Sequence, residues 1–202
     1  DKSEVAIKFP RQPIKNKDHL ALYKKEMINY REMQATGQIY NHVKILDYFI
    51  HDMNYSDTQY KTPIVVMKRY HKTLQDLIAE REKLGKSFRK AEIVSFIHAF
   101  IDHFRHLEKQ GIVWGGCCPE SIFIDENYIF VMGDFAISRE LKEGLLSLES
   151  RKMIFDYYSP PEFKPSSKYD VYMFGSILYE MLTFSKYKID LYHERVQTLG
   201  EF

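Results

Sequence analysis

The chain has 202 residues, of which 45% are hydrophobic and 28% are charged, and this composition excludes an intrinsically disordered protein. The formal net charge of +1 provides no broad electrostatic field for nucleic acid or an anionic membrane, so we expect neither as a partner. We expect no signal peptide, and the longest apolar-rich stretch, residues 93–101, is too short to span a bilayer.

The first forty residues predict a strand followed by a helix. Residues 5–9 are a short run typical of a strand, and Pro10 closes it. The helix is predicted to begin after Asp18, a good N-cap, and to stop at Gly37. Its apolar and aromatic residues at helical spacing are Leu20, Tyr23, Met27 and Tyr30.

The next segment predicts two strands and a modest helix. Residues 43–50 and 63–67 have the composition of strands, and the polar residues 51–58 between them predict a turn. A helix is predicted over residues 73–83.

A long apolar stripe predicts the strongest helix of the chain, which Gly111 closes. The stripe consists of Ile93, Phe96, Ile97, Phe100, Ile101, Phe104 and Leu107. His98, His103 and His106 also lie on this helix, with Asp102 beside His103. A metal site is one interpretation of these histidines, but we favour a solvated helix face.

The last third predicts a strand pair, a loop and a helix. Residues 121–124 and 128–132 are short strands, residues 138–156 are typical of a long surface loop, and residues 169–184 predict an apolar helix. Strands with one helix thus precede mainly helical sequence, which indicates an α+β protein in two lobes. We place the lobes at residues 1–67 and 68–202.

The two cysteines, Cys117 and Cys118, are adjacent and cannot build a disulfide framework. Reduced thiols in an intracellular, cytoplasmic compartment are the better interpretation. A zinc site needs further ligands, and none lies near in sequence.

Four motifs now resemble one family, the protein kinases. Residues 5–8, Val-Ala-Ile-Lys, resemble the V-A-I-K strand, and residues 133–136, Gly-Asp-Phe-Ala, resemble the D-F-G segment with alanine in place of glycine. Residues 158–162, Tyr-Ser-Pro-Pro-Glu, are similar to the A-P-E end of the activation segment. Residues 168–175 are similar to the start of the large buried helix of the second lobe.

The order of these motifs implies the bilobal kinase-like fold over nearly the whole chain. The resemblance starts at the third strand of the small lobe and stops just after the large buried helix. No glycine-rich phosphate loop precedes Lys8, and the last helices of the large lobe do not follow. We therefore expect a domain that is incomplete at both ends.

Aligned on Pro119-Glu120, the loop V-W-G-G-C-C-P-E-S-I-F takes the place of the catalytic loop H-R-D-L-K-P-E-N-I-L. The resemblance puts Trp114 at its histidine, Gly115 at its arginine, Gly116 at its catalytic aspartate, Cys118 at its lysine and Ser121 at its metal-binding asparagine. Glycine cannot accept a proton from a substrate hydroxyl, a neutral thiol stabilises little phosphoryl charge, and a serine hydroxyl is a weak magnesium ligand.

The resemblance also implies a nucleotide site. Lys8 would hold phosphates and pair with Glu26, and Asp134 would hold a single magnesium ion. Ala6, Met67 and Phe123 would line the adenine pocket. The alternative is an ion pair of Lys8 and Glu26, with Asp134 nearby and no ligand.

Residues that hold the kinase fold together are retained, in contrast to the catalytic ones. The interlobe stack would consist of Ile45, Tyr30, Phe135 and Trp114, and Asp170 would bind backbone N–H groups of the loop. The sequence therefore predicts a pseudokinase that is no active enzyme, that binds ATP with Mg²⁺ if it binds a cofactor, and that acts through protein partners. An active divergent kinase and a purely structural building block are the alternatives.

Two further features stay open. Ser147, Ser150, Tyr157 and Tyr158 fall in the activation segment, where phosphorylation sites or ordinary loop residues are both compatible with the sequence. The basic run over residues 68–72 is typical of a solvated connection, and docking of an acidic partner is the functional alternative.

Overall fold

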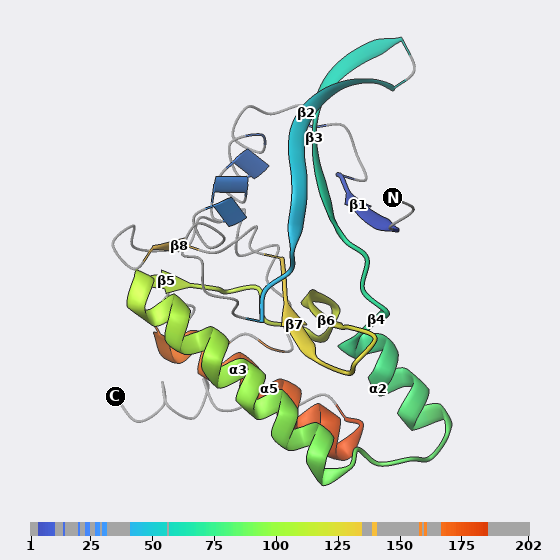
Figure 1. The fold of residues 1–202 in the computed structure, drawn as a ribbon, viewed down its shortest axis with the longest axis vertical. Coiled ribbons are helices and arrows are strands. Elements are labelled where there is room, and N and C mark those ends of the chain that lie inside the picture. Colours follow the sequence, from blue (N-terminus) through green and yellow to red (C-terminus); the bar gives the residue numbers. More distant parts are fainter. Residues whose placement is uncertain are drawn as a thin grey trace, which may run out of the picture.

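The computed structural model describes residues 4–10, 14, 20, 23–24, 27–28, 30–31, 41–55, 57–134, 139–140, 158, 160 and 167–185. Figure 1 shows a three-stranded antiparallel sheet beside a mainly helical part, which is the predicted α+β class. The division of the chain at residue 67 stays a prediction.

The first sheet contains β1 (Val5–Lys8), β2 (Ile45–Tyr55) and β3 (Thr58–Lys68) in the order β1-β3-β2. Strand β1 pairs with the end of β3, where Ala6 lies opposite Met67 and Lys8 opposite Val65. The predicted helix before β2 is present at its described positions, since Leu20, Tyr23, Met27 and Tyr30 are all helical. Asp18 and Gly37 lie outside the described residues.

The turn predicted over residues 51–58 is wrong in its length, because residues 51–55 and 58 lie in strands and only the tip of the hairpin turns. After a register shift between Ile45 and Asp47, strands β2 and β3 pair out to Tyr55 and Thr58. Polar residues suit this part of the hairpin, because the ladder satisfies their backbone groups and most of their side chains meet solvent. The hairpin therefore forms an arm that extends beyond β1 and away from the helices (Figure 1).

Short strands and residues 41–43 connect the sheet to the helical part. A second sheet has the order β4 (Lys72–Thr73), β6 (Ile122–Ile124) and β7 (Phe130–Met132), and β5 (Ile112–Val113) pairs with β8 (Arg139–Glu140). Just before β2, the amide of Val43 donates to the carbonyl of Met132 at 2.8 Å, and the amide of Met132 donates to that of Asn41 at 2.7 Å. These bonds attach the start of β2 to β7.

The predicted helices over residues 73–83, 93–107 and 169–184 are confirmed as α2 (Leu74–Lys83), α3 (Lys90–Gln110) and α5 (Ser167–Thr183). A short 3-10 helix, η1 (Pro119–Ser121), precedes β6. Helix α3 packs on α5 and β7 (Figure 1) and ends at Gly111, whose φ of 67° is the left-handed conformation that favours glycine. Among the described residues, no helix has the length and apolarity needed to cross a membrane.

The solvated face predicted for His103 and His106 is wrong. Both side chains are buried, at 0% and 3% exposure, whereas His98 is exposed as predicted. His103 follows the buried Phe96 by seven residues and His106 follows the buried Ala99 by seven, so both lie on the core face of α3. Ile101, which we placed in the apolar stripe, is 38% exposed.

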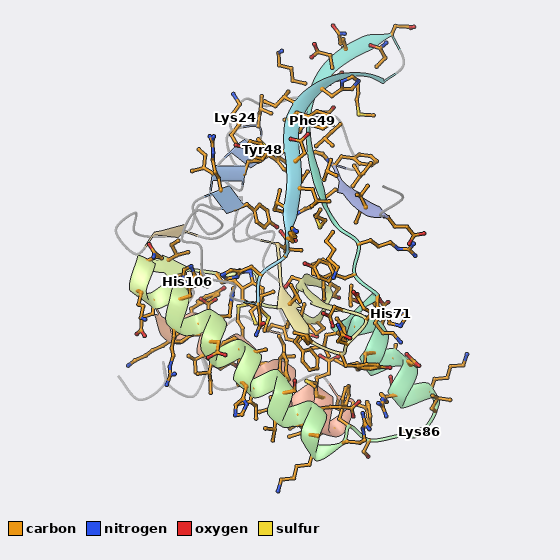
Figure 2. The ribbon with its side chains drawn as sticks, in the orientation of Figure 1. Lys24, Tyr48, Phe49, His71, Lys86 and His106 are labelled. Carbon is orange, nitrogen blue, oxygen red and sulfur yellow. The ribbon has the colours of Figure 1, made fainter. Side chains whose placement is uncertain are left out.

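These two histidines form a cluster with His42 at the end of α3 next to β5, where Figure 2 labels His106. The Nδ1 atoms of His42 and His103 are 2.9 Å apart, so one of them donates to the other. Burial lowers the pKa of His42 to about 4, with His106 acting in the same direction, and burial also lowers the pKa of His103 and of His106. Among the described residues, no group of three metal-ligating side chains is arranged to hold a metal ion.

The buried cluster predicts that the protein loses stability as the pH falls from 6.5 towards 4. In this window the unfolded chain takes up protons that the folded histidines resist, and His42 alone accounts for about 2 kcal/mol between pH 7 and pH 5. The measurement is chemical denaturation of the wild type and His42→Asn at both pH values. His42→Asn should lose less stability than the wild type on acidification.

The exposed His98→Asn change on the same helix is the matched control and should lose as much stability as the wild type. Burial raises the pKa of Asp170 to about 6, which acts in the opposite direction, but this contribution is common to all three proteins and cancels in the comparison. An equal loss of stability in His42→Asn and the wild type would contradict the lowered pKa of the buried His42.

Candidate functional site

The centre of the candidate site is an ion pair between Lys8 and Asp134. Lys8 ends β1, and Asp134 comes two residues after β7. The Nζ of Lys8 lies 2.8 Å from Oδ1 of Asp134, and the side chains are 32% and 48% exposed. The structure thus brings together two of the predicted site residues across 126 positions of sequence, and both remain open to solvent.

The backbone of Asp134 is fixed from two directions. Its φ is 57°, a left-handed conformation that is uncommon outside glycine and that aspartate tolerates better than most residues. Its amide donates to the hydroxyl of Tyr30 at 3.1 Å. The indole Nε1–H of Trp114 donates to the carbonyls of Gly133 at 3.0 Å and Asp134 at 3.1 Å. Residues from two distant segments therefore hold this turn.

Asp170 anchors the loop that carries Trp114. Its two carboxylate oxygens accept the backbone N–H groups of Trp114 at 2.8 Å and Gly115 at 2.7 Å, as the resemblance implied. Gly115 has a φ of 68°, so a glycine suits this position. Burial raises the pKa of Asp170 to about 6, while the two N–H groups act to lower it.

The side chain of Ser121 points back into the same loop. Its hydroxyl oxygen lies 2.5 Å from the carbonyl of Gly116 and 2.9 Å from that of Cys118, and it accepts the amide of Cys118 at 3.1 Å. Because the hydroxyl has one proton, it donates to one of these carbonyls at a time. Ser121 is buried at 3% exposure and here closes the loop on itself.

Both cysteines are free thiols in the core, at 0% and 2% exposure. Burial raises the pKa of Cys117 well above its usual value and that of Cys118 to about 12. Cys118 is therefore a neutral thiol at physiological pH and supplies no charge to a phosphoryl group.

The predicted adenine pocket contains a tight contact at Gly133. A Cβ atom added to Gly133 would lie 2.6 Å from Cγ2 of Val43 and 2.7 Å from Cε2 of Phe123. The ring of Phe123 thus occupies the space that a side chain at residue 133 would need. Tyr70 also packs on Phe123, with ring centroids 5.5 Å apart, and Ala6 and Met67 face each other on β1 and β3.

The basic run over residues 68–72 is largely neutralised within the chain. The ion pairs are Lys68 with Glu126, Arg69 with Glu4 and Lys72 with Glu80. Four of these side chains, from Lys68, Glu126, Arg69 and Glu4, line an open depression of about 670 Å³. An acidic partner would have to displace these carboxylates, so the solvated connection is the better account of the run.

Of the other residues that the sequence singled out, some are buried and some lie outside the part of the chain that the structure describes. Tyr158 is 1% exposed and its hydroxyl donates to Glu180 at 2.5 Å, so this arrangement gives a modifying enzyme no access to it. Of the predicted interlobe stack, Ile45, Tyr30 and Trp114 are buried. Several predicted residues lie outside the described ones, namely Glu26, Phe135, Ser147, Ser150, Tyr157 and Glu162.

Sequence reasoning missed the packing of Tyr70 and Gly133 against Phe123 and the indole N–H of Trp114 as a hydrogen-bond donor. The motif contained Gly133, but motif matching says nothing of the space around a glycine. The sequence places Trp114 in the interlobe stack and predicts no hydrogen bond for its indole. The direction of its N–H depends on how Asp170 holds the backbone, which no local pattern encodes.

Comparison with known proteins agrees with this geometry. A family model described as protein tyrosine and serine/threonine kinase matches residues 1–198. The chain is 35% identical over 82 residues to G protein-coupled receptor kinase 2 of Drosophila melanogaster, which is 39% of the chain and 11% of that protein. It is 26% identical over 121 residues to human tyrosine-protein kinase Srms, which is 57% of the chain and 25% of that protein.

The aligned parts span a quarter or less of these two relatives. The family model, by contrast, covers almost the whole chain and includes the strand of Lys8, the Gly133-Asp134 turn and the Asp170 helix. The chain belongs to the protein tyrosine and serine/threonine kinase family.

Proposed function

We propose that this chain is a pseudokinase domain, which acts by binding as a scaffold, an allosteric partner or a component of an assembly and does not transfer phosphate. The observation that carries the proposal is the set of polar contacts made by the loop at residues 114–121. Its described polar contacts anchor the loop to Asp170, to the Gly133-Asp134 turn and to itself. The loop thus serves as structural support.

The missing chemistry is specific. Phosphoryl transfer needs a group that accepts the proton of the attacking hydroxyl, and Gly116 has no side chain for it. Loss of such a base costs about 10²–10⁴-fold in rate. The Cys118 thiol is neutral and buried, and the Ser121 hydroxyl is bonded to loop carbonyls, so neither compensates.

A magnesium nucleotide fits the residues that remain, in part. Lys8 offers an ammonium group for phosphate oxygens, and Asp134 offers a carboxylate for one magnesium ion, a hard cation that prefers oxygen ligands. The exposure of both side chains permits access. Ser121 does not fit a second metal ligand, because its hydroxyl is turned into the loop. When bound, the nucleotide would supply phosphate oxygens to Lys8 and to the magnesium ion that Asp134 would hold.

Such a domain would act through protein partners in an intracellular compartment, where its two thiols stay reduced. Phosphotransfer by a divergent but active kinase is the alternative, and it requires a base supplied from elsewhere in the molecule. A building block without nucleotide is the second alternative.

A phosphotransfer assay tests the proposed inactivity. Purified protein incubated with labelled ATP and Mg²⁺ or Mn²⁺ should transfer no phosphate to itself or to generic protein substrates. Gly116→Asp should stay inactive as well, because Cys118 and Ser121 remain unsuited to the reaction. Robust transfer by the wild type that Lys8→Ala abolishes would defeat the proposal, and turnover in Gly116→Asp would show that the other losses matter little.

A thermal shift experiment tests the nucleotide site separately. ATP with Mg²⁺ should raise the melting temperature, because a ligand at 100 times its Kd stabilises the native state by about 2.7 kcal/mol. Lys8→Ala and Asp134→Asn should abolish the rise. Lys61→Ala, which removes an exposed lysine paired with Asp52 on the hairpin arm, is the matched control and should keep it. No rise in the wild type would favour the building block without nucleotide.

A further inference from the structure

Trp114 is the only tryptophan of the chain and is fully buried, at 0% exposure. It stands at the position where the kinase resemblance has a histidine. Apolar packing alone would account for its burial, but its polar contacts have a further consequence for the site.

Trp114 is held both at its backbone and at its indole N–H. On one side the backbone N–H of Trp114 donates to Asp170 at 2.8 Å, and the ring meets His103 edge-on with centroids 4.9 Å apart. On the other side Nε1–H is shared between the carbonyls of Gly133 at 3.0 Å and Asp134 at 3.1 Å. A rigid ring thus connects the Asp170 anchor to the backbone of the site.

The Gly133-Asp134 turn, which the indole holds, has an energetically unfavourable backbone conformation at Asp134. A φ of 57° at a non-glycine residue costs about 1–3 kcal/mol and persists only when its surroundings fix it. The indole fixes the carbonyl side of Asp134, and the Tyr30 hydroxyl fixes its amide. With the backbone in this conformation, the carboxylate of Asp134 lies 2.8 Å from Lys8.

We infer that Trp114 is a positioning residue, whose indole N–H holds the Gly133-Asp134 turn and thereby orients Asp134 for magnesium nucleotide beside Lys8. This inference rests on the proposed nucleotide site. An indole N–H is a donor only and does not titrate, whereas an imidazole exchanges donor and acceptor roles around neutral pH. The tryptophan therefore keeps the turn in place whatever the protonation of the histidines behind it.

The test compares Trp114→Phe, which removes the N–H and keeps an aromatic ring, with Trp114→His, which restores a ring N–H. The affinity for ATP with Mg²⁺, measured by calorimetry, should fall about three- to tenfold in Trp114→Phe, the size of one net hydrogen bond. Trp114→His should recover part of it. Phe96→Leu, a core change on α3 at a ring that contacts Phe130 and Phe174, controls for lost stability and should keep the affinity.

A second readout needs no nucleotide. Amide hydrogen exchange at Gly133 and Asp134 should be faster in Trp114→Phe than in the wild type, in Phe96→Leu and in Trp114→His. If the wild type binds no nucleotide, the proposed site fails, and this exchange still decides the positioning role. Unchanged exchange in folded Trp114→Phe, or unchanged affinity where the wild type binds, overturns the inference.

If Trp114→Phe does not fold, the wild type alone decides. The chain has one tryptophan, so its NMR spectrum has one indole N–H signal. Slow exchange of that proton with solvent, and a shift of its signal when ATP and Mg²⁺ are added, support the role. Fast exchange overturns it.

Discussion

The candidate site depends on the hydrogen bonds between the buried carboxylate of Asp170 and the backbone of the loop. It is 1% exposed and accepts the N–H groups of two successive residues, Trp114 and Gly115. A buried carboxylate needs such donors, because desolvation without them is costly. By accepting both, Asp170 sets the direction in which the loop leaves β5 and the place where the Trp114 ring enters the core. The indole then reaches Gly133 and Asp134, and Asp134 reaches Lys8.

This series of contacts explains how the loop keeps its shape with Gly116, Cys118 and Ser121 at the positions of the family's catalytic residues. In the family the same loop carries the groups that move a proton and stabilise phosphoryl charge. Here Ser121 ties the loop to the carbonyl of Gly116, and the two thiols are buried and neutral. The histidine cluster packs behind Trp114 and bridges α3 to the start of β2. These contacts hold the loop in place without the aspartate, lysine and asparagine that the family has there.

The order of the family motifs along the sequence predicted which distant segments form the candidate site. The V-A-I-K and Gly-Asp-Phe segments identified Lys8 and Asp134 as neighbours, although 126 positions separate them, because the family fold places these strands together. The helical period identified α2, α3 and α5, since each has a core to cover.

Local patterns failed where three-dimensional context decides the outcome. The hairpin arm has polar residues that resemble a turn, because exposed strands carry little hydrophobic signal. His103 and His106 were assigned to solvent because histidine is polar, although their spacing from Phe96 and Ala99 places them on the core face. The role of the Trp114 N–H could not be predicted, because it depends on the positions of two distant carbonyl groups.

Amide hydrogen exchange in Asp170→Asn tests the account most directly. Asparagine keeps the shape but offers one acceptor oxygen where two N–H groups need one each, so exchange at the Trp114 or Gly115 amide should speed up by about five- to 150-fold, which corresponds to about 1–3 kcal/mol. Asp52→Asn, an exposed change on the hairpin arm, should leave both exchange rates as they are in the wild type. Unchanged exchange at both amides in folded Asp170→Asn would contradict the anchoring role assigned to Asp170.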